Sequence, residues 1–431
     1  MRFIHTADWH LGRLFHGVHL TDDQRYALLQ LVDLVRDAKP DAVLVAGDIY
    51  DRAIPPPEAV ELLDEILCKI VLEAKVPVVL IAGNHDSPHR LNFASRLFRD
   101  NRLYVTGQMP AVCKPVTFSD AWGDVRIYPV PYAEPATVRE ALGDGSELCV
   151  CHDTAMREVC ARIRAAHDDG GRSILVGHAF VMGGAECESE RPLSVGGAGT
   201  VAAGHFAGFD YVALGHLHAP QTIWNGEKRE ASNEKREGSS TSTAVESDRG
   251  ASPVSHSRTT HVRYSGSLLK YSFDEADQSK GVYVVEMDGD GRCAVETIRL
   301  TPKRDVRRVS GTMADLLTEG GDGKSRDDYV EVTILDDGPV IDPVGRLRQV
   351  YPNVMQIKRP ERAGGPVAAD RIDVRGKTAV ELFSSFFKHV RGDELSADQE
   401  VALRGVVDEL ARKEREADGG KTTRAVEQVG A

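Results

Sequence analysis

The sequence has no long hydrophobic run. Its best apolar stretch, 76–82, has the length of a β-strand, whereas a membrane-spanning helix needs about 18 apolar residues. The N-terminal segment reaches an acidic side chain at Asp8, which is too early for a secretory signal peptide. We therefore predict a protein with no membrane association and no secretion signal.

Cysteine is scarce and has no metal-type spacing. There are 7 cysteines among 431 residues, and Cys149 and Cys151 are separated by one residue rather than by the two of a C-x-x-C motif. A chain of this length can bury a large core without disulfide bonds. We expect reduced thiols and a cytoplasmic location.

Basic residues are outnumbered by acidic ones. The 53 Lys and Arg residues against 66 Asp and Glu residues give a net charge of −13. This balance argues against a protein that coats nucleic acid through bulk charge, although it is compatible with a local basic groove. The composition is otherwise that of a globular protein, and the length predicts two to three domains.

The first part of the chain alternates short apolar segments with amphipathic ones. One helix is expected from Thr21, where Thr21 and Gln24 have the spacing of a capping box, and another from about 58 to 74. Alternation at short range implies parallel strands with right-handed crossovers. The predicted class is α/β, with packed sheets and helices outside. The expected strands are 3–7, 42–46, 76–82, 126–129, 173–177, 210–214, 262–264 and 281–287.

Two later segments differ from this main domain, which we assign to residues 1–302. Residues 225–261 contain almost no large apolar side chain, so no burial offsets the entropy of ordering them, and we predict a disordered insertion. Residues 303–372 predict a small α+β domain, with a strand at 328–335 and a helix at 344–350.

The C-terminal region predicts two amphipathic helices within 376–417, followed by a disordered polar tail at 418–431. Ser396 and Gln399 have capping-box spacing at the start of the second helix. The apolar faces are larger than a helix pair can hide on itself, which favours a partner site. They consist of Val380, Phe383, Phe386, Phe387, Val390, Leu403, Val406, Val407 and Leu410.

Five short segments place Asp, Asn or His directly after predicted strands. Each segment alone has an ordinary structural explanation as a turn or a strand end. Together they predict a metal site, because sites in α/β sheets lie at the carboxyl ends of strands and residues i and i+2 of an extended segment point to the same side. The candidate ligands are Asp8, His10, Asp48, Asn84, His178, His216 and His218.

Seven candidate ligands are too many for one ion. Oxygen and nitrogen ligands without thiolate suit Mn, Fe or Zn, and two ions roughly 3.5–4 Å apart are a common device for displacement at phosphorus. We expect Asp48 to bridge the two ions. His85 is the candidate to stabilise the transition state or protonate the leaving oxygen, with Asp51 holding its imidazole.

In this order the motifs resemble the calcineurin-type metallophosphoesterase superfamily. Longer segments resemble the SbcD family of bacterial nuclease subunits. Together these resemblances cover about 1–224 and 262–415. The segments are 8–12, 82–87, 189–197, 264–267, 328–330 and 351–354.

The resemblance implies a metallophosphoesterase β-sandwich flanked by helices, with two Mn²⁺ ions, or Mg²⁺ or other divalent ions in their place. It further implies a capping domain that shapes a DNA groove, and C-terminal helices that dock on the ATPase SbcC. SbcD-like subunits are expected to form a homodimer within a two-plus-two heterotetramer. The implied activities, in DNA repair, are ATP-dependent double-strand exonuclease and single-strand or hairpin endonuclease.

Two other functions stay open at this point. One is a metallophosphoesterase acting on nucleotides or small phosphodiesters, and the other is a non-enzymatic scaffold with structural metals. Candidate DNA contacts lie beside the motifs or where the capping domain begins, and both groups are equally compatible with solvated surface. They are Arg13, His16, Arg52, His89, Arg90, and the cluster Lys303, Arg304, Arg307 and Arg308.

Overall fold

The computed structural model describes most of the chain as two compact units, Met1–Arg359 and Pro360–Ala431. The tail predicted at 418–431 and residues 228–258 of the predicted insertion lie outside the described residues. The predicted domain boundaries therefore stay predictions. The described residues are 1–111, 113–143, 148–167, 170–190, 199–227, 259–319, 326–338, 340–360, 378–391, 394–407 and 409.

Two six-stranded sheets form the centre of the first unit. In the first sheet, four neighbouring strands are parallel, as the alternating pattern predicts, and β15 and β16 add an antiparallel edge. Its order is β16 (Cys293–Arg299), β15 (Gly281–Met287), β1 (Arg2–Thr6), β4 (Ala42–Val45), β5 (Val78–Ile81) and β6 (Leu103–Thr106).

The second sheet combines a parallel centre with antiparallel edges. β8, β9, β12 and β14 are parallel, whereas β7 and β13 each pair antiparallel with a neighbour. Its order is β13 (Gln221–Glu227), β14 (Thr259–Tyr264), β12 (Tyr211–Gly215), β9 (Arg172–His178), β8 (Gly123–Pro129) and β7 (Val116–Asp120). Because β13 and β14 pair as far as Glu227 and Thr259, the insertion predicted at 225–261 is too wide at both ends.

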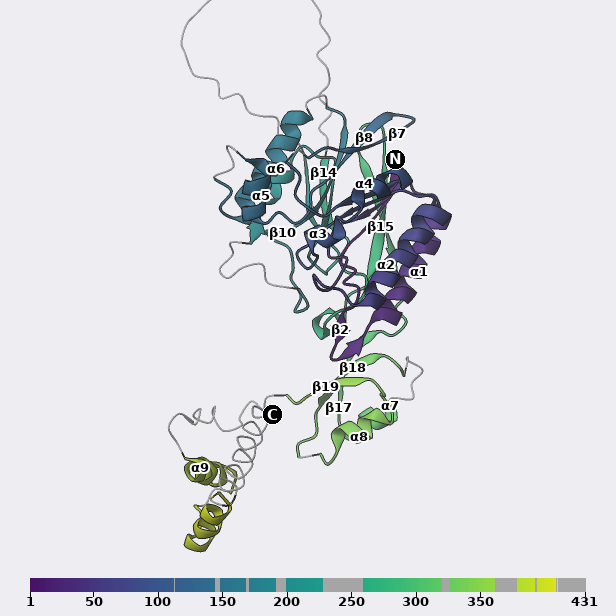
Figure 1. The fold of residues 1–431 in the computed structure, drawn as a ribbon. Coiled ribbons are helices and arrows are strands. Elements are labelled where there is room, and N and C mark those ends of the chain that lie inside the picture. Colours follow the sequence, from purple (N-terminus) through teal and green to yellow (C-terminus); the bar gives the residue numbers. More distant parts are fainter. Residues whose placement is uncertain are drawn as a thin grey trace, which may run out of the picture. The chain divides into compact units, whose positions relative to one another are not determined.

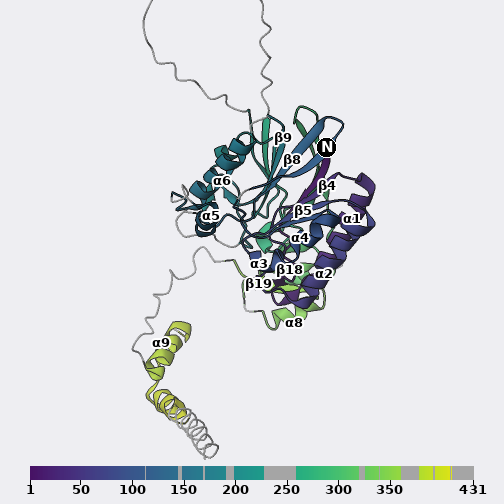
Figure 2. The ribbon, with the colours of Figure 1, turned by 45° about the horizontal axis from the view of Figure 1, so that its top comes forward.

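The two sheets pack face to face, and helices cover their outer faces (Figures 1 and 2). Alternate side chains of a strand point to opposite faces. Phe3, Leu44 and Val79 therefore join the core between the sheets, while Ile4, Val43 and Val78 join the core that contains residues of α1 and α2. The fold class predicted from the sequence is confirmed.

The helices on the first sheet are α1 (Thr21–Ala38) and α2 (Pro57–Leu67), and α2 continues into a π-helical segment, Cys68–Glu73. The helices on the second sheet are α5 (Pro135–Leu142) and α6 (His152–Ala166). The capping box predicted at Thr21 is wrong: Leu20 is the N-cap and no side chain caps the helix. The Gln24 side chain instead bonds to residues of the candidate site.

Short elements complete this main part of the chain. They are β2 (Leu14–Phe15), β3 (Val18–His19), α3 (Pro88–Leu91), α4 (Ser95–Phe98), β10 (Phe180–Val181), β11 (Thr200–Val201), and the 3₁₀ turns Arg99–Asn101, Ala203–Phe206 and Phe273–Glu275.

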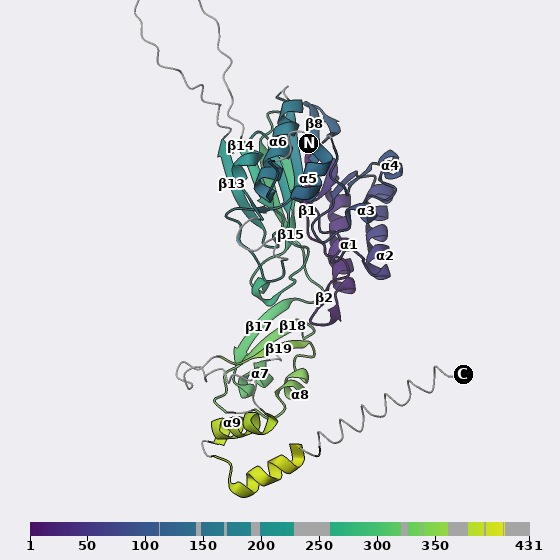
Figure 3. The same cartoon turned by 60° about the vertical axis from the view of Figure 1, so that its left-hand side comes forward.

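A small parallel sheet follows the main sandwich (Figure 3). It consists of β17 (Val306–Gly311), β18 (Tyr329–Ile334) and β19 (Val354–Lys358), and it packs with α7 (Met313–Glu319) and α8 (Pro343–Arg348) around its own apolar core. Asp23 of α1 joins this cap to the sandwich, since it accepts bonds from Arg304 at 2.8 Å and from the Tyr329 hydroxyl at 3.1 Å.

The second unit contains α9 (Ala379–Arg391) and a further helix over 397–407. The capping box predicted for that helix is confirmed, because the Gln399 side chain accepts from Ser396 N at 2.9 Å and Ser396 Oγ accepts from Gln399 N at 3.4 Å. Phe383, Val401 and Val406 are exposed. Across the described part of the chain, no helix has the length and apolar character needed to cross a membrane.

Candidate metal centre

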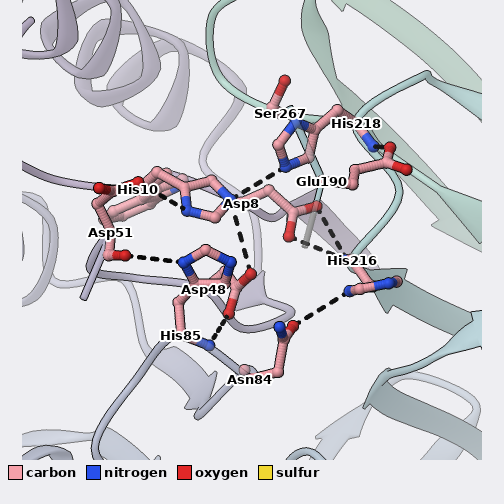
Figure 4. Close-up of polar contacts among 12 residues, drawn as sticks. Asp8, His10, Asp48, Asp51, Asn84, His85, Glu190, His216, His218 and Ser267 are labelled. Atoms are coloured by element: carbon pink, nitrogen blue, oxygen red, sulfur yellow. Dashed lines mark hydrogen bonds and ion pairs between the residues drawn. The ribbon is translucent and has the colours of Figure 1, made fainter. Parts of the chain in front are cut away.

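The five predicted strand-end segments meet in one place, and Figure 4 labels residues from four of them. Asp8 and His10 follow β1, Asp48 follows β4, Asn84 follows β5, and the remaining three histidines belong to β9 and the segment after β12. The carboxylate of Asp48 lies between two imidazoles, since its Oδ2 is 3.6 Å from His10 Nε2 and 3.5 Å from His178 Nε2.

The other contacts close the cluster. Asn84 Oδ1 lies 2.9 Å from His178 Nε2 and 3.1 Å from His216 Nδ1. His10 Nε2 lies 3.0 Å from His218 Nε2. Asp8 accepts from the main-chain N of His216 at 2.9 Å. All seven candidate ligands thus lie in one cluster, and six of them are buried.

The backbone at this cluster is strained. Asp8, His10, Asp48 and His216 have φ angles of 53°, 45°, 51° and 106°, in a region that residues other than glycine rarely adopt. Such conformations cost free energy and persist where the surrounding structure enforces them, which is common at functional sites. The backbone therefore directs these four side chains into the cluster at a cost in conformational free energy.

Burial and charge set the protonation states of these groups before a metal binds. Burial lowers the pKa of His10 well below its usual value and that of His216 to about 3, so both imidazoles are neutral. Burial raises the pKa of Asp48, but the charge of His178 and their hydrogen bond outweigh it and lower the pKa well below the usual range. Burial lowers the pKa of His178, but the charge of Asp48, their hydrogen bond and the charge of Asp8 together outweigh burial and raise the pKa to about 9.

The ligand atoms of this cluster suit two divalent cations, because the protein alone does not satisfy all of them with hydrogen bonds. Two neutral imidazoles, His10 and His218, face each other through Nε2, and the buried Nδ1 of His10 has no hydrogen-bond partner among the described residues. Two groups of metal-binding atoms share Asp8: Asp8 with His10 and His218, and Asp8 with Asp48 and His178. A cation would give the imidazole nitrogens of His10 and His218 a partner in addition to each other.

Two protein families match this chain, and the first match covers most of the residues that form the sandwich and the cluster. The family described as calcineurin-like phosphoesterase matches residues 1–220, more than half of the 431-residue chain. The chain belongs to the calcineurin-like phosphoesterase family. A second family, SbcD_C, described as the type 5 capsule protein repressor C-terminal domain, matches residues 302–391. The predicted resemblance to SbcD is confirmed: the protein is a phosphoesterase of SbcD type.

Two solved structures resemble this phosphoesterase at low identity. The TT1561 protein of Thermus thermophilus is 14% identical, with a TM-score of 0.34, and the match covers 70% of this chain and 99% of that one. A dimetal phosphatase from Danio rerio is 12% identical, with a TM-score of 0.39, and the match covers 70% of this chain and 96% of that one.

His85 lies beside the cluster, but Asp51 does not hold it in the predicted way. The His85 ring bonds through Nδ1 to the main-chain oxygen of Asp51 at 2.8 Å. The Asp51 carboxylate instead forms an ion pair with Arg13 at 3.0 Å. The hypothesis that this carboxylate orients His85 is therefore wrong. The main chain does so, because a carbonyl oxygen accepts only and keeps a hydrogen on Nδ1.

Two buried polar residues, Gln24 and Asp86, brace the phosphoesterase site in a way that no local sequence pattern indicated. Gln24 donates to the main-chain oxygens of Trp9 and His10, at 3.1 and 2.7 Å. Asp86 accepts from the main-chain N of Ile49, Tyr50 and Gly83, at distances of 2.9 to 3.0 Å. These bonds hold the strained segments from outside the cluster.

The basic cluster at the start of the cap is neutralised by nearby acids. Arg304 pairs with Asp23 at 2.8 Å and Arg307 with Asp328 at 2.6 Å. Lys303 and Arg308 lie 3.9 and 3.6 Å from acidic partners, Asp22 and Asp277. Arg13 and Arg52 both pair with Asp51, at 3.0 and 3.9 Å, and the side chain of Arg52 is 53% exposed. These ion pairs favour a structural role for Arg304 and Arg307.

Gly83 provides the space that the Asp48 carboxylate occupies. A Cβ at this position would lie 2.1 Å from Asp48 Oδ1 and 2.3 Å from Asp48 N. We expect Gly83→Ala to displace Asp48, to weaken Mn²⁺ binding in calorimetry, and to destabilise the fold by about 1–3 kcal/mol through overpacking. Gly204→Ala is the matched control, since nothing lies within 4 Å of the added carbon. Equal Mn²⁺ affinity in both variants would contradict this expectation.

Proposed function

We propose that this phosphoesterase is the nuclease subunit of an SbcC–SbcD-type DNA repair complex, and that it hydrolyses DNA phosphodiesters with two divalent ions, preferably Mn²⁺. The observation that carries the proposal is the position of Asp48 between His10 and His178. It supports Asp48 as the bridge between one position near His10 and His218 and another near His178 and Asn84.

The bound ions would lower the pKa of a water molecule and neutralise charge on the phosphate oxygens. The chain's own residues supply the rest. Asp8, Asp48 and Asn84 offer oxygen atoms, and the imidazoles of His10, His178, His216 and His218 offer nitrogen atoms. His85 keeps a hydrogen on Nδ1 through the Asp51 carbonyl, so its Nε2 is the atom that exchanges a proton with the leaving oxygen.

The SbcD_C match of the C-terminal part supports the proposal of DNA as the substrate and SbcC as the partner. The SbcD_C match spans the cap and α9, and the second unit presents apolar side chains to solvent. A homodimer within a two-plus-two assembly and a cytoplasmic location, in line with seven free cysteines, belong to the same proposal.

A substrate panel tests the activity. Purified protein with Mn²⁺ is assayed on linear duplex DNA, on hairpin DNA and on a small phosphodiester, with and without SbcC and ATP. We expect hairpin cleavage by the protein with Mn²⁺ and duplex degradation that depends on SbcC and ATP. Hydrolysis of the small phosphodiester or of nucleotides alone, with DNA intact under every condition, would contradict the nuclease proposal.

The C-terminal helices carry a separate prediction. Phe383, Val401 and Val406 are exposed apolar side chains on a short helical unit, and helix-in-groove docking is a recurrent mode of partner recognition. Deleting residues from Gly376 onward should leave a folded protein that binds Mn²⁺ but loses SbcC and ATP-dependent duplex degradation. Co-purification of the truncated protein with SbcC at wild-type yield would contradict this assignment.

A further inference from the structure

His218 makes a polar contact on each side of its ring. Its Nε2 faces His10 within the metal centre, and its Nδ1 lies 2.5 Å from Ser189 Oγ. A neutral imidazole carries one hydrogen, so an Nε2 that offers its lone pair to a cation requires the hydrogen on Nδ1. The group facing Nδ1 must therefore accept a hydrogen bond.

The Ser189 hydroxyl alone does not determine which nitrogen of His218 carries the hydrogen, because a serine hydroxyl can donate or accept. His178 shows the contrast. Its Nδ1 lies 2.9 Å from the main-chain oxygen of Ala46, and a carbonyl only accepts. In the neutral form that can bind a cation, the tautomer of His178 is thus fixed by the backbone, whereas that of His218 depends on what orients Ser189.

Glu275 orients the Ser189 hydroxyl. Its Oε1 accepts from Ser189 Oγ at 2.5 Å and from Ser272 Oγ at 2.7 Å, and its Oε2 pairs with Lys280 Nζ at 2.5 Å. The carboxylate is fully buried, and each of these contacts offers it a hydrogen. Since an ionised carboxylate only accepts, Ser189 donates to Glu275 and has a lone pair free for the Nδ1–H of His218.

We propose that Glu275 is a positioning residue of the metal centre: acting through Ser189, it holds His218 in the tautomer whose Nε2 binds the cation. The inference rests on the proposed function, because it assigns His218 as a ligand. Partners of this kind, which orient a metal-ligating histidine, typically change metal affinity about 10–100-fold when they are mutated.

Glu275→Gln in the full chain tests the inference without relying on activity. Lys280 only donates, so it will attract the amide oxygen and turn the amide NH₂ toward Ser189, which reverses the direction of donation to His218. We expect Mn²⁺ affinity in calorimetry to fall about 10–100-fold. In ¹⁵N-histidine NMR of the metal-free protein, the His218 hydrogen should move from Nδ1 to Nε2, with His218→Gln giving the assignment.

Asp277→Asn is the matched control. It removes the same charge two residues along the chain from Glu275, and the Asp277 side chain is 96% exposed. Ser189→Ala removes the relay without touching Glu275 and decides the case if Glu275→Gln does not fold. Wild-type affinity and an unchanged His218 tautomer in both relay variants would overturn the inference. A wild-type protein that binds no Mn²⁺ would instead overturn the proposed function.

Discussion

Asp48→Asn should abolish phosphodiester hydrolysis while the fold survives. The substitution keeps the shape of the side chain. It also keeps an oxygen that can accept from the main-chain N of His85, which lies 2.9 Å from Asp48 Oδ1. It removes the negative charge that sits between His10 and His178. Because metal-ion catalysis supplies several kcal/mol of transition-state stabilisation, we expect turnover to fall about 10³-fold or more.

The measurement is the hydrolysis rate across a range of Mn²⁺ concentrations, together with a thermal unfolding curve. Asp64→Asn is the control, since Asp64 is an exposed carboxylate on α2. Near-normal activity of Asp48→Asn at low Mn²⁺ would show that Asp48 does not bridge the ions.

His85→Ala should separate chemistry from binding. The ring lies beside the cluster and bonds to the main-chain oxygen of Asp51 rather than to a neighbouring ligand. Removing it should leave both ions and DNA binding in place, while turnover falls about 10²–10⁴-fold, the range for a general acid or base.

Metal content measured by mass spectrometry and DNA binding measured by fluorescence anisotropy accompany the rate assay for this variant. His19→Ala is the control, because His19 is an exposed histidine on β3. If His85→Ala loses an ion, then His85 is a ligand and its assignment as a proton donor is wrong.

The sequence predicted the fold and the composition of the cluster for a physical reason. Parallel strands carry their carboxyl ends to one edge of a sheet, so Asp8, Asp48 and Asn84 could be expected to meet. The short, buried strands that precede these three residues have a clear apolar pattern in the sequence. His178 and His216 come from the second sheet, and their proximity to the others depends on how the two sheets pack, which no local pattern specifies.

The residues that support the ligands could not be predicted in this way. Ser189 and His218 are 29 positions apart in the chain, and Ser189 and Glu275 are 86 positions apart. A contact between such distant segments has no periodicity or spacing. Gln24 shows the opposite problem, because its spacing from Thr21 indicated a helix cap, whereas tertiary contacts with Trp9 and His10 determine where its side chain lies.

Ion stoichiometry tests the central claim most directly. Metal-stripped full-length protein is dialysed against increasing Mn²⁺, the bound ions are counted by mass spectrometry, and DNA hydrolysis is measured at each step. We predict two Mn²⁺ ions per chain, with hydrolysis appearing only as the second position fills and disappearing with a chelator. Hydrolysis at full rate with no ion bound, or with a single ion, would contradict the two-ion centre.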